Sequence, residues 1–250
     1  MNQLTLSSAN AIDEAEATTR ICRGAVADRP KDNFFISALC RADDCQGHPR
    51  LVTFAVVMAK ANDNRYSIRP LDGEDLVRVK SFCDEAIGEN YYSLEELKAI
   101  FAKSKKDQMM CSFILEDAST QKIHGVRITY PPGNWSKGKG QGLSPDLWQK
   151  PLADVAYFQS LFIGKELAGQ GWGSRLSLAS IEALKALGAK AIVTHSWKES
   201  PNDSSGKYLR GLGFQTVAVH PLYWKDVDYN CTRCLKPPCQ CTAEEMIKYL

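Results

Sequence analysis

The chain has 250 residues, of which 44% are hydrophobic, and it carries a formal net charge of +2. This composition suits one globular domain of up to about 200 residues plus an extension, with enough apolar side chains for a core. No run rich in lysine and arginine indicates a nucleic-acid surface, and no stretch approaches the roughly 18 apolar residues of a membrane span.

The first 62 residues are expected to form an N-terminal extension. Residues 1–20 are polar and lack the apolar core of a signal peptide, which favours a cytoplasmic protein whose nine cysteines are thiols or metal ligands. Two β-type runs at 33–40 and 50–59 flank a polar turn and predict a β-hairpin. Cys40, Cys45 and His48 lie in this hairpin and Cys22 lies upstream of it; either they form a loose metal site or the hairpin cysteines only pack.

The main domain is expected at 63–250, after the polar break at 61–64. Strands are predicted at 66–71, 110–117, 122–130, 155–163, 191–197, 214–224 and 241–250. Helices are predicted at 72–88, from Ser93 onward, at 174–187 and at 204–211. Ser93 and Glu96 form the pattern of a capping box. Residues 131–153 are a long loop where a tight turn is usual, which favours a functional or disordered segment.

This order of elements predicts an α/β fold. The sheet is expected to be mixed, mostly antiparallel and about seven-stranded, with helices on both faces.

A glycine-rich turn joins the strand at 155–163 to the next helix. Gly169, Gly171 and Gly173 lack a Cβ, so an anion can approach the backbone, and the first N–H groups of a helix attract it. The spacing matches neither the dinucleotide fingerprint nor the nucleotide-triphosphate loop, because Ser174 and Arg175 follow Gly173. The alternative is a tight turn that binds no ligand.

Two ordered segments resemble the GNAT superfamily of N-acetyltransferases. Leu161-Phe162-Ile163, followed by the turn at 169–174, resembles its acyl-CoA-binding core, although Ala168 stands where Arg or Gln is usual. Residues 202–214 resemble the family's Asn … Phe-Tyr-x-x-x-Gly-Phe segment. The resemblance implies that the parallel strands ending near Ile163 and Trp197 splay apart and admit the pantetheine arm of acetyl-CoA. It also implies these cofactor-binding residues: Leu161, Phe162, Ile163, Gly169, Gln170, Gly171, Trp172, Gly173, Ser174 and Asn202.

The candidate catalytic residues depart from the family pattern. In the family, a Glu that acts as the general base is usual early in this strand. Tyr157 occupies that position here, and the nearest carboxylate is Asp154. His195 on the neighbouring strand is another candidate base, as is His124, and each histidine could equally be a packed or surface residue. The Tyr that acts as the general acid in the family aligns with Leu209 here. The preceding residue, Tyr208, either serves as the acid or packs in the core. Asn202 could cap the following helix or bind the cofactor arm.

Four cysteines lie within 11 residues in a hairpin expected at 230–242. They are Cys231, Cys234, Cys239 and Cys241. Their spacing favours one structural zinc ion. The alternatives are a hairpin of reduced thiols and a redox pair.

We therefore expect transfer of an acetyl group from acetyl-CoA to an amine acceptor that the sequence does not identify. The alternative is a catalytically weak GNAT-like module that binds acyl-CoA or is stabilised by zinc for an interaction, because Tyr157 and Leu209 replace the usual base and acid. Neither nucleic acid nor a membrane is an expected partner. A homodimer is a possible assembly state.

Overall fold

The computed structural model describes residues 65–89, 91–135, 142–227, 231 and 233–250. The predicted extension, its β-hairpin, its four candidate metal ligands and the boundary near residue 62 lie outside the described residues.

A seven-stranded sheet in the order β1-β4-β5-β6-β7-β9-β8 forms the centre of the domain. All its neighbouring strands are antiparallel except β6 and β7, which are parallel. The predicted fold class is therefore confirmed. The strands are β1 (Tyr66–Pro70), β4 (Phe113–Asp117), β5 (Ile123–Tyr130), β6 (Val155–Ile163), β7 (Ala191–Trp197), β8 (Gln215–His220) and β9 (Ala243–Tyr249). A separate pair, β2 (Lys105–Lys106) and β3 (Met109–Met110), is too short for sequence periodicity to predict.

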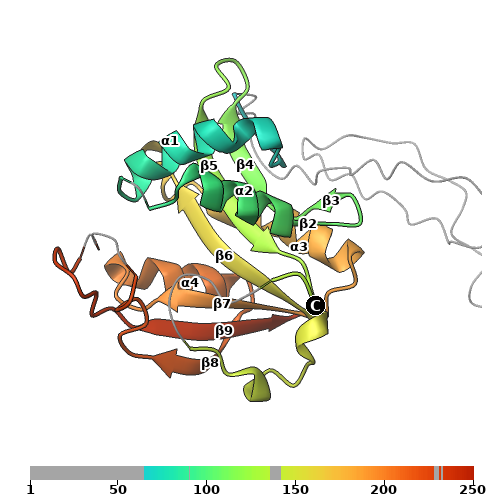
Figure 1. Ribbon diagram of the computed structural model, residues 1–250, viewed down its shortest axis with the longest axis vertical. Helices are drawn as coiled ribbons and strands as arrows, with labels where there is room; N and C mark the ends of the chain where they lie inside the picture. Colours follow the sequence, from blue (N-terminus) through green and yellow to red (C-terminus); the bar gives the residue numbers. More distant parts are fainter. Residues whose placement is uncertain (1–64, 90, 136–141, 228–230, 232) are drawn as a thin grey trace, which may run out of the picture. The chain divides into compact units, whose positions relative to one another are not determined.

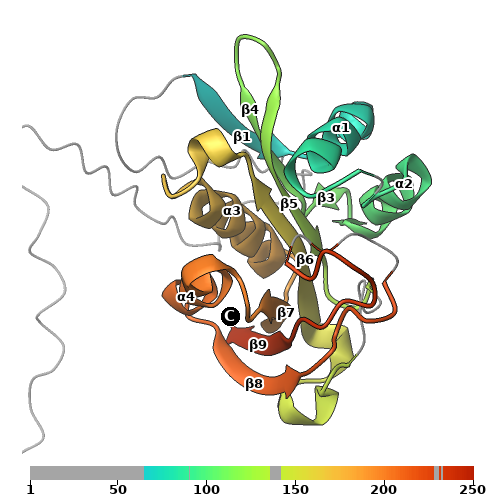
Figure 2. The same ribbon diagram turned by 90° about the vertical axis from the view of Figure 1, so that its left-hand side faces the viewer.

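Helices cover both faces of the sheet. Figures 1 and 2 show α1 (Leu76–Ala86) and α2 (Leu94–Lys103) on one face, and α3 (Trp172–Ala186) and α4 (Ser204–Gly211) on the other. The capping box at the start of α2 is confirmed, since Ser93 and Glu96 each accept the other's backbone N–H. The first predicted helix is shorter than expected, because Gly73–Asp75 form a 3-10 turn before α1 begins.

Alternating side chains of the central strands build a core on each face. In β7, Val193 packs with the residues beneath α1 and α2, whereas Ile192 packs with Ile181 and Leu184 of α3. Each fully buried aliphatic side chain of this kind contributes about 1.5–3 kcal/mol. The two cores hold β6 and β7 firmly at the middle of the sheet.

Strands β6 and β7 separate after a short paired stretch. Only Val155–Phe158 pair with Ala191–Thr194, and beyond this point the strands diverge (Figure 1). The register of β6 with β5 shifts between Phe158 and Ser160, which leaves Gln159 as an extra residue. A bulge of this kind bends a strand and increases its twist, so it accounts for the divergence of β6.

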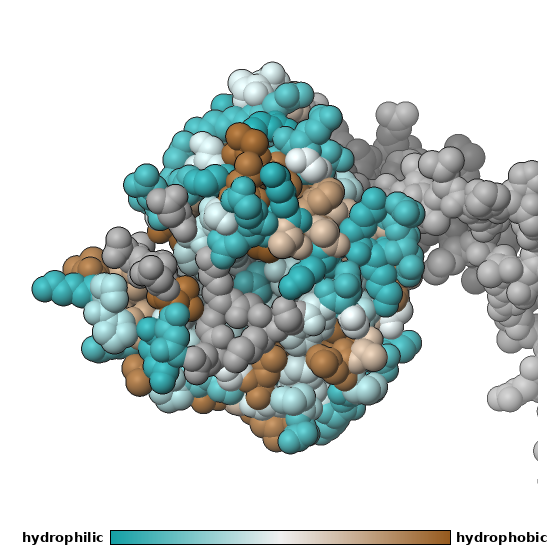
Figure 3. Space-filling model, viewed as in Figure 1, coloured by the Kyte–Doolittle hydropathy of each residue, from teal (hydrophilic) through white to brown (hydrophobic). Residues whose placement is uncertain are grey.

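The surface shows no dominant apolar face in the view of Figure 3, where small brown patches are scattered among polar side chains. Within the described part of the chain, no helix has both the length and the apolar character needed to cross a bilayer.

Candidate active site

Beyond Phe158, the divergence of the two strands leaves one edge of β6 without a strand partner in the described part of the chain. On its other edge, Leu161, Phe162 and Ile163 pair with Arg127, Val126 and Gly125 of β5. Along the β7 side, strand pairing within the described residues ends at Phe158. Backbone N–H and C=O groups of the 161–163 stretch are thus placed where an extended ligand could pair with them.

The N-terminus of α3 lies directly after the glycine turn. Gly169 and Gly171 have φ angles of 76° and 81°, a left-handed conformation that glycine adopts at no steric cost, and Gly171 is the N-cap. The helix begins at Trp172 and not at the predicted residue 174, so Trp172, Gly173 and Ser174 form its first turn. Their N–H groups have no acceptor within the helix.

The other side chains of this turn have supporting positions. A Cβ on Gly173 would lie 3.1 Å from Cδ2 of Leu161, so glycine there permits close packing of α3 on β6. Trp172 is buried against the same strand, and the Gln170 amide donates to the carbonyl of Glu166 (2.9 Å). Arg175 places its guanidinium 4.4 Å from the Trp172 ring centre. This cation adds to the attraction of the helix N-terminus for an anion.

Tyr157 and His195 form a hydrogen-bonded pair at the point where the strands part. The Tyr157 hydroxyl lies 2.8 Å from Nδ1 of His195. Burial raises the pKa of Tyr157 well above its usual value and lowers the pKa of His195 to about 4. Near neutral pH the tyrosine is therefore protonated and the histidine is neutral, so the hydroxyl can donate to Nδ1.

A buried carboxylate, which the sequence did not indicate, lies beside this pair. Glu245 of β9 is the register partner of His195 and is fully buried. Its oxygens lie 2.6 Å from Nε1 of Trp148 and 2.6 Å from Nε2 of His220, and the backbone N–H of Ser144 donates to it as well. Burial opposes its ionisation, but the hydrogen bonds prevail and lower its pKa. The atoms of His195, His220 and Glu245 that could coordinate a metal ion all lie within 4.8 Å of one another.

Aromatic rings cover the pair on the face of α1 and α2. Tyr223 stacks on His195 with ring centres 4.4 Å apart, and Trp135 stacks on Tyr157 at 4.8 Å. Tyr157 is consequently only 3% exposed. Trp135, Ser144 and Trp148 all belong to the long β5–β6 loop, so the described parts of that loop pack against the candidate site.

Two predicted catalytic residues lie away from the pair. Asp154 immediately precedes β6, three residues before Tyr157 and at the end remote from the 161–163 edge, and its carbonyl accepts the N–H of Lys190. The seven-residue span from Asp154 to Leu161 corresponds to about 23 Å of strand. The Tyr208 hydroxyl is hydrogen-bonded to Ser177 of α3, whereas Leu209 is buried in the core.

His124 and Asn202 are also separate from the pair. His124 is buried, and its Nδ1 lies 2.5 Å from Oε1 of Glu166. The helix-capping alternative for Asn202 is wrong, because Asp203 is the N-cap of α4 and makes no side-chain cap hydrogen bond. Ser200 instead accepts the N–H of Ser205 at 3.0 Å. Exposed Asn202 adopts a left-handed φ of 55°, which a short polar side chain tolerates, and its cofactor-binding role stays a prediction.

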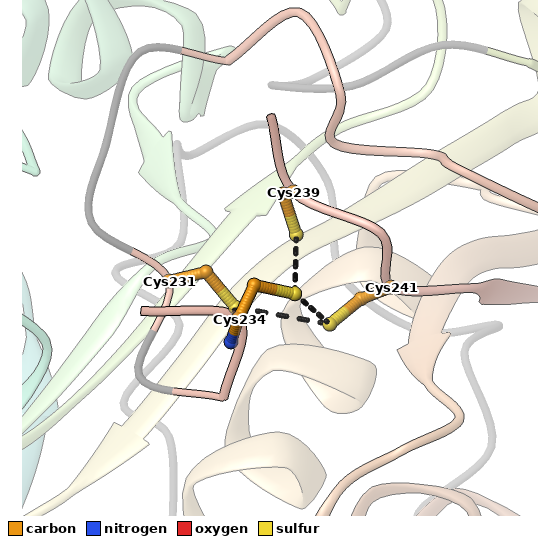
Figure 4. Close-up of side chains that lie close together, drawn as sticks. All are labelled: Cys231, Cys234, Cys239 and Cys241. Carbon is orange, nitrogen blue, oxygen red and sulfur yellow. Dashed lines mark hydrogen bonds between the residues drawn. The ribbon is translucent and has the colours of Figure 1, made fainter. Parts of the chain in front are cut away.

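The four C-terminal cysteines converge, as Figure 4 shows. Three pairs of sulfur atoms are 3.6–3.9 Å apart. All four lie within 4.8 Å of one another. The structure thus brings together the predicted metal ligands.

Comparison with solved structures identifies this architecture, whereas no family model and no curated protein sequence matches the chain. The ribosomal-protein-S18-alanine N-acetyltransferase of Escherichia coli is 16% identical, with a TM-score of 0.51 over 74% of this chain and 93% of its own. For yncA of Salmonella typhimurium, determined with its cofactor acetyl-CoA, the identity is 16% and the TM-score 0.53, over 75% and 95% of the two chains. An acetyltransferase of the GNAT family from Streptococcus pneumoniae is 14% identical, with a TM-score of 0.52 over 74% and 99%. The chain therefore has the fold of the GNAT N-acetyltransferases.

Proposed function

We propose that the chain transfers an acetyl group from acetyl-CoA to an amine. The observation that carries this proposal is the edge of β6 at Leu161–Ile163, which pairs with no described strand and lies beside the N-terminus of α3. The pantetheine amides would pair with that edge, and the pyrophosphate would accept the N–H groups of Trp172, Gly173 and Ser174. A backbone N–H of the same edge would face the acetyl carbonyl and stabilise the oxyanion.

The Tyr157–His195 pair would take the proton of the amine. A lysine-type amine has a pKa near 10.4, so a base that removes its proton assists attack on the thioester. The Tyr157 oxygen would accept the proton from nitrogen as its own hydrogen passes to Nδ1 of His195. Burial disfavours the resulting His195 cation, and the negative charge of Glu245 offsets part of this cost. His220, which is hydrogen-bonded to Glu245 and partly exposed, would offer a route to solvent.

The leaving group needs less assistance. A thiol with a pKa near 8.5 departs readily as thiolate. This explains how the chain could function with buried Leu209 where the family's acidic tyrosine is usual.

One observation favours the second candidate, a module that binds acyl-CoA and turns over weakly. Tyr157 is covered by Trp135 and almost fully buried, so an acceptor has little access to the pair in this conformation.

Incubation of the protein with acetyl-CoA and a panel of amines tests both candidates. The panel should include polyamines, aminoglycosides, peptides with free N-termini and lysine peptides, with released thiol and acetylated product both measured. We expect thiol release that requires protein and one class of amine. Acetyl-CoA binding by calorimetry without turnover would support the binding module, and absence of binding would contradict both.

A further inference from the structure

We propose that Cys231, Cys234, Cys239 and Cys241 bind one structural zinc ion, and that this ion holds Tyr223 in place over His195.

The positions of the sulfur atoms fit a single tetrahedral ion. The Sγ–Sγ distances are 3.7 Å for Cys231–Cys241, 3.9 Å for Cys234–Cys239 and 3.6 Å for Cys234–Cys241. Four ligands at the usual Zn–S distance of about 2.3 Å stand about 3.8 Å apart at the corners of a tetrahedron. A disulfide would need about 2.05 Å, so these pairs of sulfurs are not bonded, and their spacing fits a metal site.

Backbone N–H groups favour the thiolate form of two of the four cysteines. The N–H of Cys234 points to Sγ of Cys231 at 3.5 Å, and the N–H of Gln240 points to Sγ of Cys234 at 3.3 Å. Hydrogen bonds to a sulfur favour its ionised form, and donors around a metal ligand orient it. Four thiolates fill every position of a tetrahedral zinc ion and leave none for a water molecule, so the site is structural.

Few side chains are buried in the described part of the connection between β8 and β9. Among its described residues, the buried side chains are Tyr223 and three of the cysteines, whereas Leu235 is 74% exposed. Such a segment buries too little apolar surface to fold on its own account. Metal binding would supply the missing free energy, as it does in small zinc-dependent folds.

The metal site is linked to the candidate active site through two short paths. The carbonyl of Cys241 accepts the N–H of Tyr223 (3.1 Å), and Tyr223 stacks on His195. Trp197, two residues beyond His195 on β7, packs against the cysteines. Tyr223 is thus a positioning residue, and its effect on acetyl transfer rests on the proposed function.

Metal content of the full chain tests the zinc site independently of activity. Protein purified under reducing conditions without chelators should contain one zinc per chain by mass spectrometry, and Cys231→Ser/Cys234→Ser should reduce this to background. Cys83→Ala/Cys111→Ala removes the same number of thiols from cysteines that are buried in the two cores and lie outside the hairpin, and it should leave the zinc content unchanged. Metal-free native protein, iron in place of zinc, or zinc retained in the first variant would overturn the site.

Spectroscopy tests the link to His195 without an activity assay. The ring resonance of His195, assigned by its absence in His195→Gln, should shift when zinc is removed, while an unchanged far-UV circular dichroism spectrum reports a folded domain. An unshifted resonance would refute the link and keep the metal. If the native protein acetylates an amine, the zinc-free variant should show a severalfold higher acceptor KM. If it acetylates none, the proposed function fails while the metal and resonance results stand.

Discussion

Among single residues, Tyr157 and His195 provide the sharpest test of the chemistry. If they move the proton of the amine, Tyr157→Phe and His195→Gln should each lower kcat by about 100-fold or more, the range of general base catalysis. Acetyl-CoA affinity should be unchanged, because neither side chain belongs to the edge at 161–163. Steady-state kinetics and calorimetry on the same preparations separate the two effects.

Asp154→Asn is the matched control for this pair. Asp154 is the alternative base that the sequence indicated, but it precedes β6 at the end remote from the 161–163 edge. We expect its kcat to stay within twofold of the parent. A large loss in Asp154→Asn, with little change in Tyr157→Phe, would reverse the assignment.

The sequence could place single residues on strands but not against one another. Counting along β6 identified Tyr157, and the pattern of β7 identified His195. Their hydrogen bond depends on the parallel register of two strands joined through α3. No sequence pattern indicated Glu245 or His220, because the hydrogen bond between them depends on the bulge in β8 and on the 22-residue connection from β8 to β9. Buried polar clusters of this kind are determined by tertiary register and not by local pattern.

At the level of elements, the start of α3 is where cofactor binding can be tested. Gly171 has a positive φ, and nothing lies within 4 Å of the position that a Cβ would take. Gly171→Asp should place a carboxylate beside the pyrophosphate and weaken acetyl-CoA binding by about tenfold or more, since like charges about 5 Å apart repel by about 1 kcal/mol or more even in solvent.

Gly171→Asn isolates the charge in this experiment. Asparagine has nearly the same shape and tolerates the left-handed conformation at least as well, so its Kd should rise much less than that of the aspartate variant. Equal affinities for the two variants, measured by calorimetry on folded protein, would move the pyrophosphate away from this turn.

Elements with strong local signals were predicted well. The order of strands and helices in the described domain followed from periodicity, and the capping box of α2 is confirmed. The start of α3 was misplaced by two residues, because the glycines conceal where the helical turn begins. The splay of β6 and β7 was implied by the family resemblance, and its physical cause, the bulge at Gln159, has no sequence signature.

For the whole molecule, the buried polar cluster at the centre of the sheet links stability to pH. His195 from β7 is surrounded by Tyr157 from β6, His220 from β8, Glu245 from β9 and Tyr223. Burial holds its pKa at about 4, below the ordinary value of 6.5. Between these values the unfolded chain binds a proton that the folded protein does not, so stability is lost as pH falls through this range.

This linkage predicts a measurable loss of folding stability at mildly acidic pH. With pKa values of 6.5 unfolded and about 4 folded, lowering the pH from 7.5 to 5 should reduce the free energy of unfolding by about 2 kcal/mol through His195 alone. Urea unfolding at the two pH values measures it. His195→Gln keeps a hydrogen-bonding side chain but cannot take up the proton, so its loss over the same interval should be smaller by that amount. An equal loss of stability in parent and variant would show that other groups control the acid sensitivity. The first to consider are the carboxylates of Glu245, Asp75 and Asp117, whose pKa values are also lowered.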